Sequence, residues 1–201
     1  PKNLKESHMF FLTKFVHTLR LPPYLLKHRL EEAIKGELEK LFLDKVVTDS
    51  GLCASVYDIL DIKGGFIAPG EGAATYEVEF RLIMFRPFVG EIIAAKLKEF
   101  DANGLRLSVG FFDDIYVPAH LLPIPSTFGP HPDNKEYMVW VYEFEGIKCY
   151  VDGIDEIRLR VNNVTYPPIP FEQLEGSKPF APMIITGAIN DSGLGPISWW
   201  L

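Results

Sequence analysis

Apolar and polar residues alternate with a period of two along much of this chain, a pattern typical of β-strands with one buried face. The clearest case is residues 76–85, where apolar side chains would share one face while Glu77, Glu79 and Arg81 lie on the other. Residues 9–19 and 52–62 are predicted to form two further strands because aromatic and β-branched side chains are frequent in them. The first half of the chain is therefore predicted to contain at least three strands.

A helical pattern interrupts these strands. Apolar residues between positions 24 and 43 recur at helical intervals, at Leu26, Leu30, Ile34, Leu38 and Leu41. The preceding Pro22-Pro23 ends the first strand, and proline is tolerated in a first helical turn. We predict a helix from Tyr24 to about Leu43. The segment Lys63–Gly72, rich in glycine and containing Pro69, is predicted to be a loop between the second and third strands.

The pattern changes at Arg86-Pro87, where we place a domain boundary. Beyond it, residues 93–97 and 105–109 alternate on either side of an Asp-Ala-Asn-Gly turn at 101–104, which is a strong hairpin signal. Further short strands are predicted at 115–117, 138–144 and 157–164, with a small helix near 119–122, and the chain closes with 183–188 and the tail 193–200. Tyr166–Pro182 is rich in proline and is predicted to be a surface loop. Several short strands with one small helix are typical of an OB-type barrel, so the predicted fold class is α+β.

The charge balance excludes one class of function. The chain has 20 basic and 27 acidic residues and a net charge of −7, which is unlike a polybasic protein that binds nucleic acid without specificity. Residues 1–86 carry equal numbers of each sign, whereas residues 87–201 carry 8 basic and 15 acidic residues. No apolar run approaches the roughly 20 residues that span a bilayer, so we expect no membrane partner. Residues 1–8 are expected to be left from cloning, with Met9 as the native start.

No arrangement of residues predicts catalysis. Asp113 and Asp114 are adjacent, and successive side chains on a strand point to opposite faces, so the two carboxylates would not converge as an acid–base pair. Cys53 and Cys149 are interpreted as small hydrophobes within strands, and no histidine lies at metal-ligand spacing from a carboxylate or thiol. Glu71 lies within a glycine-rich loop that lacks the Lys-Ser/Thr of a phosphate-binding loop. We therefore expect no catalytic residue, metal or cofactor.

One face of the predicted barrel suggests an RNA contact. If residues 93, 95, 97, 105 and 107 face the core, then Lys96, Lys98 and Arg106 lie outside, with Lys98 nearly opposite Arg106 across the turn. Like charges in that position cost stability, which an anion site would justify. Tyr116 would add a platform on which a base can stack. The alternative is that these residues only solubilise the exterior of a barrel.

Two apolar groups have open interpretations. Phe66 and Ile67 in the predicted loop 63–72 either anchor a partner or fold back onto their own domain. Trp199 and Trp200 near the C-terminus either bind a partner or close one end of the barrel, and we favour closure.

The order and spacing of several motifs resemble the larger stalk subunit of eukaryotic RNA polymerase III, which has relatives in RNA polymerase II and in the archaeal enzyme. The resemblance extends from Met9 to the C-terminus. The segments that carry it are Met9–Leu12, Leu19–Pro23, Asp44–Val47, Gly51–Cys53, Pro69–Ala73, Phe80-Arg81 and Phe85–Phe88, with Gly110–Pro118 and Gly193–Trp200 pointing to the polymerase III branch. Where members of the family often carry a long acidic insertion before the final strand, this chain has only the short segment 166–182.

The resemblance implies a fold and a set of partners. It implies a tip domain over residues 9–86, made of an antiparallel sheet with a packed helix, and an OB-fold of the RNA-binding type over residues 87–201. It implies a nuclear, non-catalytic subunit that pairs with a smaller stalk subunit, attaches to the polymerase core, supports transcription initiation and contacts single-stranded RNA weakly.

The site residues are expectations on the same footing. The tip loop that docks on the core would comprise Gly64, Gly65, Phe66, Ile67, Pro69, Gly70 and Gly72. The apolar residues Phe85 and Phe88, expected to be exposed at the domain junction, would contact the smaller subunit. Lys96, Lys98, Arg106 and Tyr116 would contact RNA. The alternative from another class is a free-standing, single-stranded RNA-binding OB-fold protein, which would need no tip domain.

Overall fold

The computed structural model describes residues 9–131, 138–153, 155–170 and 180–200. The chain forms two compact units, one spanning His8–Arg86 and the other containing the residues from Pro87 onward. Residues 1–8, which we expected to be left from cloning, and positions 171–179 of the expected surface loop lie outside the described residues. None of the described helices is long and apolar enough to cross a membrane.

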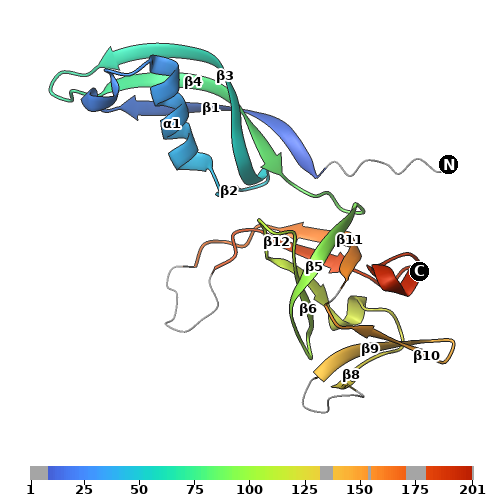
Figure 1. Ribbon diagram of the computed structural model, residues 1–201. Helices are drawn as coiled ribbons and strands as arrows, with labels where there is room; N and C mark the ends of the chain where they lie inside the picture. The colour runs from blue at the N-terminus through green and yellow to red at the C-terminus, as the bar shows by residue number, and fades with distance from the viewer. Residues whose placement is uncertain (1–8, 132–137, 154, 171–179, 201) are drawn as a thin grey trace, which may run out of the picture. The chain divides into compact units, whose positions relative to one another are not determined.

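The first unit is an antiparallel sheet with strand order β1-β4-β3-β2 (Figure 1). The strands are β1 (Phe10–Leu21), β2 (Val46–Val47), β3 (Gly51–Ile67) and β4 (Ala74–Phe85). The three strands predicted in this half are confirmed. The period-two pattern of β4 is also confirmed, because Val78, Phe80, Leu82 and Met84 are buried while Glu77 is exposed. The face with the buried residues is the one that the helix covers.

The helix begins later than predicted. Pro22 and Pro23 start a short 3₁₀ turn, η1 (Pro23–Leu25), and α1 spans only Leu30–Phe42. The reason is that Arg29 has an extended backbone, with ψ at 131°, and therefore caps the helix instead of continuing it. The acidic residues Glu31 and Glu32 in the first turn and Lys40 in the last turn complement the helix dipole.

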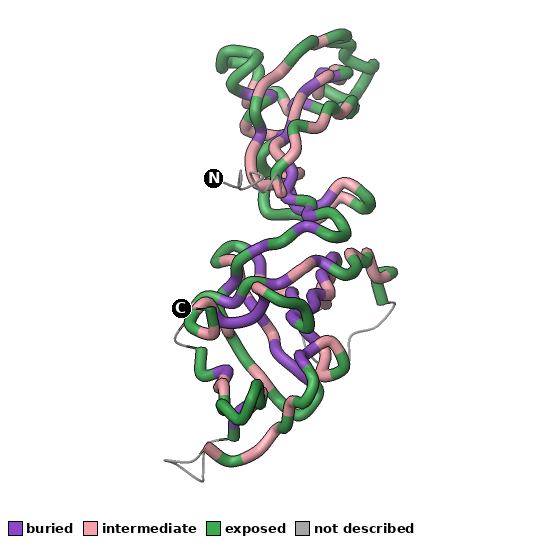
Figure 2. Tube along the Cα trace, turned by 90° about the vertical axis from the view of Figure 1, so that its right-hand side faces the viewer, coloured by how far each residue is buried: buried purple, intermediate pink, exposed green. Residues whose placement is uncertain are grey.

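The core of this unit lies between α1 and the sheet. The helix buries Ala33, Ile34 and Leu38 in the same cluster as Phe80 and Leu82 of β4. Figure 2 shows buried stretches of the chain alternating with intermediate and exposed ones in this unit. Burial of each large apolar side chain stabilises the fold by roughly 1.5–3 kcal/mol.

We predicted that the whole segment 63–72 is a loop, but its first part belongs to a strand. Strand β3 continues to Ile67, and the connection to β4 is Ala68–Ala73. The physical reason is a bulge between Gly64 and Phe66, where Gly64 and Gly65 have positive φ angles of 101° and 94°. A Cβ atom on Gly64 would lie 2.8 Å from the carbonyl oxygen of Thr75, so a glycine here allows the strand to continue.

The second unit contains a closed barrel. The sheet runs β12-β7-β6-β5-β11, and β12 also pairs with β11, so that five strands among the described residues close on one another. They are β5 (Ile92–Asp101), β6 (Gly104–Ser108), β7 (Ile115–Pro118), β11 (Glu156–Thr165) and β12 (Ile184–Ala188), with η2 (Ala119–Leu121) after β7. The predicted hairpin, short helix and OB-like barrel are confirmed, with residues 93, 95, 105 and 107 buried.

An additional sheet follows η2 and was predicted only in its central strand. It consists of β8 (Ser126–Pro130), β9 (Met138–Phe144) and β10 (Ile147–Val151). The chain then adds β13 (Gly195–Pro196), paired with β11, and the turn η3 (Ile197–Trp200). The indole of Trp199 donates to the carbonyl oxygen of Tyr150 at 3.2 Å, and its ring lies 5.5 Å from that of Tyr142. Trp199 thus packs against the additional sheet, while Trp200 is partly exposed.

Candidate nucleic-acid interface

The outer face of β5, β6 and β7 carries the residues that we predicted to contact RNA. Cross-strand pairing places Glu99, Arg106 and Tyr116 in one row. The next row on the same face is Asp101, Gly104 and Pro118. The intervening row of Phe100, Leu105 and Val117 faces inward. The other two rows, which we call the outer rows, therefore lie together on the outside of the barrel.

We predicted that Lys98 lies nearly opposite Arg106, and this is wrong. The register shifts between Leu97 and Glu99, so Lys98 is the extra residue of a bulge and Glu99 lies opposite Arg106. The predicted repulsion between like charges is therefore replaced by a cross-strand pair of opposite charge, with 3.5 Å between the guanidinium of Arg106 and the Glu99 carboxylate.

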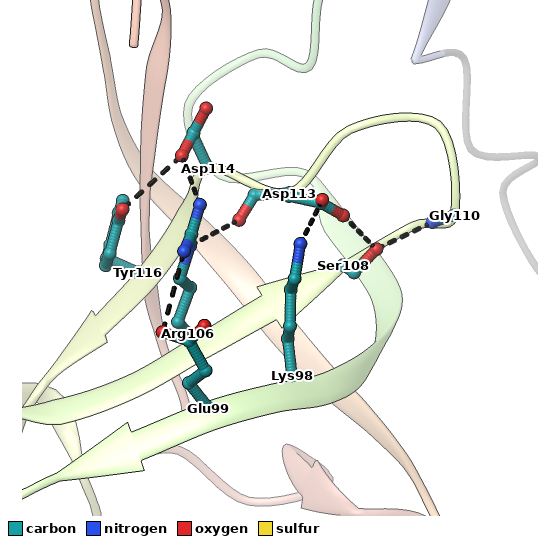
Figure 3. A network of polar contacts seen from close by, with 8 residues as sticks. All are labelled: Lys98, Glu99, Arg106, Ser108, Gly110, Asp113, Asp114 and Tyr116. Carbon is teal, nitrogen blue, oxygen red and sulfur yellow. Dashed lines mark hydrogen bonds and ion pairs between the residues drawn. The ribbon is translucent and has the colours of Figure 1, made fainter. Parts of the chain in front are cut away.

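The bulged lysine has an acidic partner. The ammonium group of Lys98 donates to the carboxylate of Asp113, which also accepts a hydrogen bond of 2.6 Å from the hydroxyl of Ser108 (Figure 3). The Ser108 hydroxyl in turn accepts from the backbone N–H of Gly110 at 3.0 Å. The hydrogen bonds from Lys98 and Ser108 lower the pKa of Asp113 below its ordinary value. Asp113 therefore stays ionised and fixes both Lys98 and the turn between β6 and β7.

The side chain of Arg106 is held on three sides. It donates to the Asp114 carboxylate at 3.0 Å and to the Asp113 carbonyl oxygen at 3.2 Å, and it lies 5.7 Å from the centre of the Tyr116 ring. Burial alone would lower the pKa of Arg106, but Tyr116, Asp114 and Glu99 raise it above its ordinary value. Burial raises the pKa of Tyr116, whose hydroxyl donates to Asp114 at 3.4 Å. Figure 3 shows these side chains converging on one face.

This network changes the charge that the face offers to a ligand. Of the three cations predicted to contact RNA, Lys98 and Arg106 are paired with carboxylates. Lys96 is exposed on β5 and makes no ion pair within the described part of the chain. The structure thus brings Lys98, Arg106 and Tyr116 together but leaves much less uncompensated positive charge than their sequence positions indicate.

The same rows border a groove. A cavity of about 350 Å³ is lined by both outer rows and by the row between them. Its lining residues are Glu99, Phe100, Asp101, Asn103, Gly104, Leu105, Arg106, Tyr116, Val117 and Pro118. Gly104 has no side chain to fill the second row, and a Cβ atom there would lie 2.1 Å from the carbonyl oxygen of Val117. The indole of Trp140 donates to the carbonyl oxygen of Asp101 at 2.9 Å, which fixes one end of the groove. Its volume is in the range of small-ligand sites.

The other predicted site residues lie on the first unit or directly after it. Phe66 and Ile67 are the last two residues of β3 and do not lie in a loop; the exposed fraction is 79% for Phe66 and 57% for Ile67. Beyond them, Glu71 pairs with Arg20 at 2.5 Å, which ties the Ala68–Ala73 connection to β1. The interpretation that Phe66 folds back onto its own domain is wrong, since a side chain so exposed covers little of the core.

The premise that Phe85 is exposed at the domain junction is also wrong. Phe85 is fully buried at the end of β4, where it pairs with both Phe10 and Leu52. Phe88 is 51% exposed, and the adjacent Val89 is 64% exposed. The exposed apolar surface here is therefore formed by Phe88 and Val89.

Sequence reasoning missed the acidic residues that determine this face. We predicted only that the carboxylates of Asp113 and Asp114 would not converge, whereas in the structure each of them holds one of the cations. The available signal was that two acidic residues precede β7, which lies beside the strand of Arg106. The glycine-lined groove and the role of Glu99 gave no signal before the register was known.

Comparison with known proteins agrees with both units. The family model for the "SHS2 domain found in N terminus of Rpb7p/Rpc25p/MJ0397" matches residues 16–72, and the model for "RNA polymerase III subunit Rpc25" matches residues 91–178. The chain is 35% identical to the DNA-directed RNA polymerase III subunit RPC8 of Bos taurus over 206 residues, covering 96% of this chain and 98% of that protein. The corresponding subunit of Schizosaccharomyces pombe is 32% identical, with 96% of this chain and 100% of the relative covered.

The RNA polymerase II subunit rpb7 of Schizosaccharomyces pombe is 30% identical over 64% of this chain and 75% of that protein. An SHS2 unit followed by an OB-like barrel places the chain in the Rpb7-like class of polymerase stalk subunits. Within that class, the chain belongs to the RNA polymerase III family of Rpc25 and RPC8.

Proposed function

We propose that this chain acts as the larger stalk subunit of RNA polymerase III in the nucleus, as a non-catalytic component of the transcription complex that supports initiation. The observation that carries this proposal is the similarity to polymerase III subunits over 96% of the chain, which includes both the SHS2 unit and the barrel. A free-standing RNA-binding protein would have no need of the first unit, whose sheet and helix form a separate core.

The chain docks on the polymerase core through the end of β3 and the connection that follows it. This tip comprises Gly64, Gly65, Phe66, Ile67, Pro69, Gly70 and Gly72. The exposure of Phe66 and Ile67 supports this proposal, since large apolar side chains in such a position are typical anchors of a protein interface. The Arg20–Glu71 pair supports it as well, because an ordered connection loses less conformational entropy when it binds.

The smaller stalk subunit contacts Phe88. The supporting observation is the pair of exposed apolar residues Phe88 and Val89 directly after β4. Apolar surface in contact with water is unfavourable in free energy, and a partner that covers these side chains would remove that contact. Phe85 supports this contact only indirectly, because its buried ring fixes the end of β4 from which Phe88 follows.

The barrel contacts single-stranded RNA weakly through the face of Lys96, Lys98, Arg106 and Tyr116. OB-fold barrels commonly bind oligonucleotides on their second and third strands, which correspond here to β6 and β7. Since Lys98 and Arg106 are already paired, the contact depends more on stacking against Tyr116 than on attraction to phosphates.

The test is affinity purification of the tagged chain from cells with an active RNA polymerase III. The parent should capture both the smaller stalk subunit and the polymerase core. Phe66→Ser/Ile67→Ser should keep the smaller subunit and lose most of the core, whereas Phe88→Ser should weaken capture of the smaller subunit. Leu41→Ser/Leu60→Ser is a matched control, because it removes two other partly exposed leucines from the first unit.

Capture of neither partner by the parent would contradict the proposal and would favour a free-standing RNA-binding protein. Equal loss of the core in the Phe66/Ile67 variant and in the Leu41/Leu60 control would contradict docking through the tip while leaving the polymerase assignment intact.

A further inference from the structure

We propose that the groove between the two outer rows of β5, β6 and β7 is a pocket for a single nucleobase, and that it prefers guanine. This proposal rests on the proposed RNA contact and deepens it, because it states which part of the RNA the face recognises. Glu99 and Arg106 would determine the preference, and Tyr116, over whose ring Arg106 lies, would form part of the wall.

The shape of the groove supports one planar ligand. Gly104 lines it between Asp101 and Pro118, and because a Cβ atom there would lie 2.1 Å from the Val117 carbonyl oxygen, glycine lets β6 and β7 approach closely at this point. Its volume of about 350 Å³ exceeds what one base needs and is far below what a folded partner would fill. Because Trp140 holds the backbone of Asp101 and the bulge fixes Glu99, the walls are set before a ligand arrives.

The charge of the groove argues against recognition of phosphate. Glu99 and Asp101 line one side, and the only cation in the lining, Arg106, is paired with Asp114. Because two carboxylates and a single guanidinium line the groove, a phosphate would be repelled, whereas a neutral base with N–H donors would not be. A guanidinium or ammonium side chain from a partner protein would be repelled by Arg106, which already lies over the Tyr116 ring.

The pairing of Glu99 with Arg106 selects among the bases. Asp114 accepts from Arg106 at 3.0 Å, but Glu99 lies 3.5 Å from the guanidinium and its side chain is 57% exposed. Glu99 is therefore the carboxylate with accepting capacity for a ligand. Guanine carries two adjacent N–H donors that match both oxygens of one carboxylate, and its neighbouring O6 accepts from arginine. Adenine, cytosine and uracil lack this combination of two donors beside an acceptor.

The experiment uses the full chain and four fluorescent heptanucleotide RNAs that differ only at the central base: U₃GU₃, U₃AU₃, U₃CU₃ and U₇. Fluorescence anisotropy should show about tenfold tighter binding to U₃GU₃ than to U₃AU₃, as expected for one bidentate contact to a base. Glu99→Gln should abolish this preference and leave U₇ binding nearly unchanged. Glu145→Gln, which removes an exposed carboxylate from the β9–β10 turn, is the control and should retain the preference.

The outcomes separate the two proposals. Measurable binding of all four RNAs with equal affinity would overturn the guanine pocket and leave the RNA contact standing. No binding of any RNA would contradict the proposed RNA contact itself. As a second measurement, titration of the ¹⁵N-labelled chain with guanosine 5′-monophosphate should shift the amide signals of Gly104, Arg106 and Tyr116. Shifts confined to other surfaces would overturn the location.

Discussion

Asp113→Asn should strengthen the electrostatic part of RNA binding, although it removes only one charge. In the parent, the Asp113 carboxylate neutralises Lys98 and also accepts from Ser108. Asparagine has nearly the same shape, and its amide oxygen can still accept from Ser108. The substitution should therefore leave the turn between β6 and β7 folded while it makes Lys98 available to a phosphate.

The magnitude follows from counting the cations that are available. Each phosphate contact of a single strand contributes about −0.7 to the slope of log affinity against log salt concentration, so three available cations would give a slope near −2. Because Lys98 and Arg106 are paired, the parent retains only Lys96 and should show a slope near −0.7. Asp113→Asn should add one contact and steepen the slope to about −1.4.

The assay is anisotropy of a fluorescent U₇ RNA with the full chain over a series of potassium chloride concentrations. Glu145→Gln raises the net charge by the same amount at an exposed turn and should not change the slope. A slope near −2 in the parent that Asp113→Asn does not alter would refute the reasoning, because it would mean that Lys98 and Arg106 contact phosphates despite their carboxylate partners.

Two further predictions concern stability. Lys98 and Ser108 lower the pKa of Asp113, so the stabilisation that its carboxylate provides is complete above about pH 4 and is lost as the pH falls through the lower, folded-state pKa. Urea unfolding should show Asp113→Asn to be less stable than the parent at about pH 6, by no more than about 1 kcal/mol since the pair is partly exposed, and the difference should shrink as the pH falls below about 4; a difference that grows on acidification would contradict this linkage. Phe80→Ala should destabilise the first unit by about 3–5 kcal/mol, because the fully buried ring packs against Phe15 and Phe42, while Phe66→Ala should stay within about 0.5 kcal/mol of the parent. Equal unfolding midpoints for the two variants would show that the core lies elsewhere.

The strands could be predicted because burial of one face leaves a period-two record in the sequence. This holds for β4 and for the hairpin of β5 and β6, where the buried residues are those that the alternation indicates. It fails for β8 and β10, whose residues are mostly exposed or half-buried and so leave no clear alternation in the sequence. The same logic explains the error in the helix, because apolar spacing records which residues could share a face but not the extended backbone of Arg29.

The candidate site was harder to predict because bulges shift the register without changing the composition. Glycine at positions 64 and 65 suggested a loop, yet these residues let β3 continue through a bulge. At Lys98 the sequence carries no glycine to mark the bulge, so uninterrupted alternation from the core-facing residues 97 and 107 placed Lys98 nearly opposite Arg106. The partners of the two cations come from positions 113 and 114, and the pairing of β5, β6 and β7 brings them together.

The bulge at Lys98 determines both the charge and the shape of the proposed pocket. If the pairing of Leu97 with Leu107 continued without a bulge, Lys98 would lie opposite Arg106, and two cations would be adjacent on this face. With one extra residue, Glu99 takes that place, and the lysine is displaced toward Asp113. The face therefore carries a carboxylate beside a guanidinium instead of two adjacent cations, and its attraction to the phosphates of any nucleic acid is weaker. In a subunit of net charge −7, that exchange favours weak binding that depends on the identity of the base.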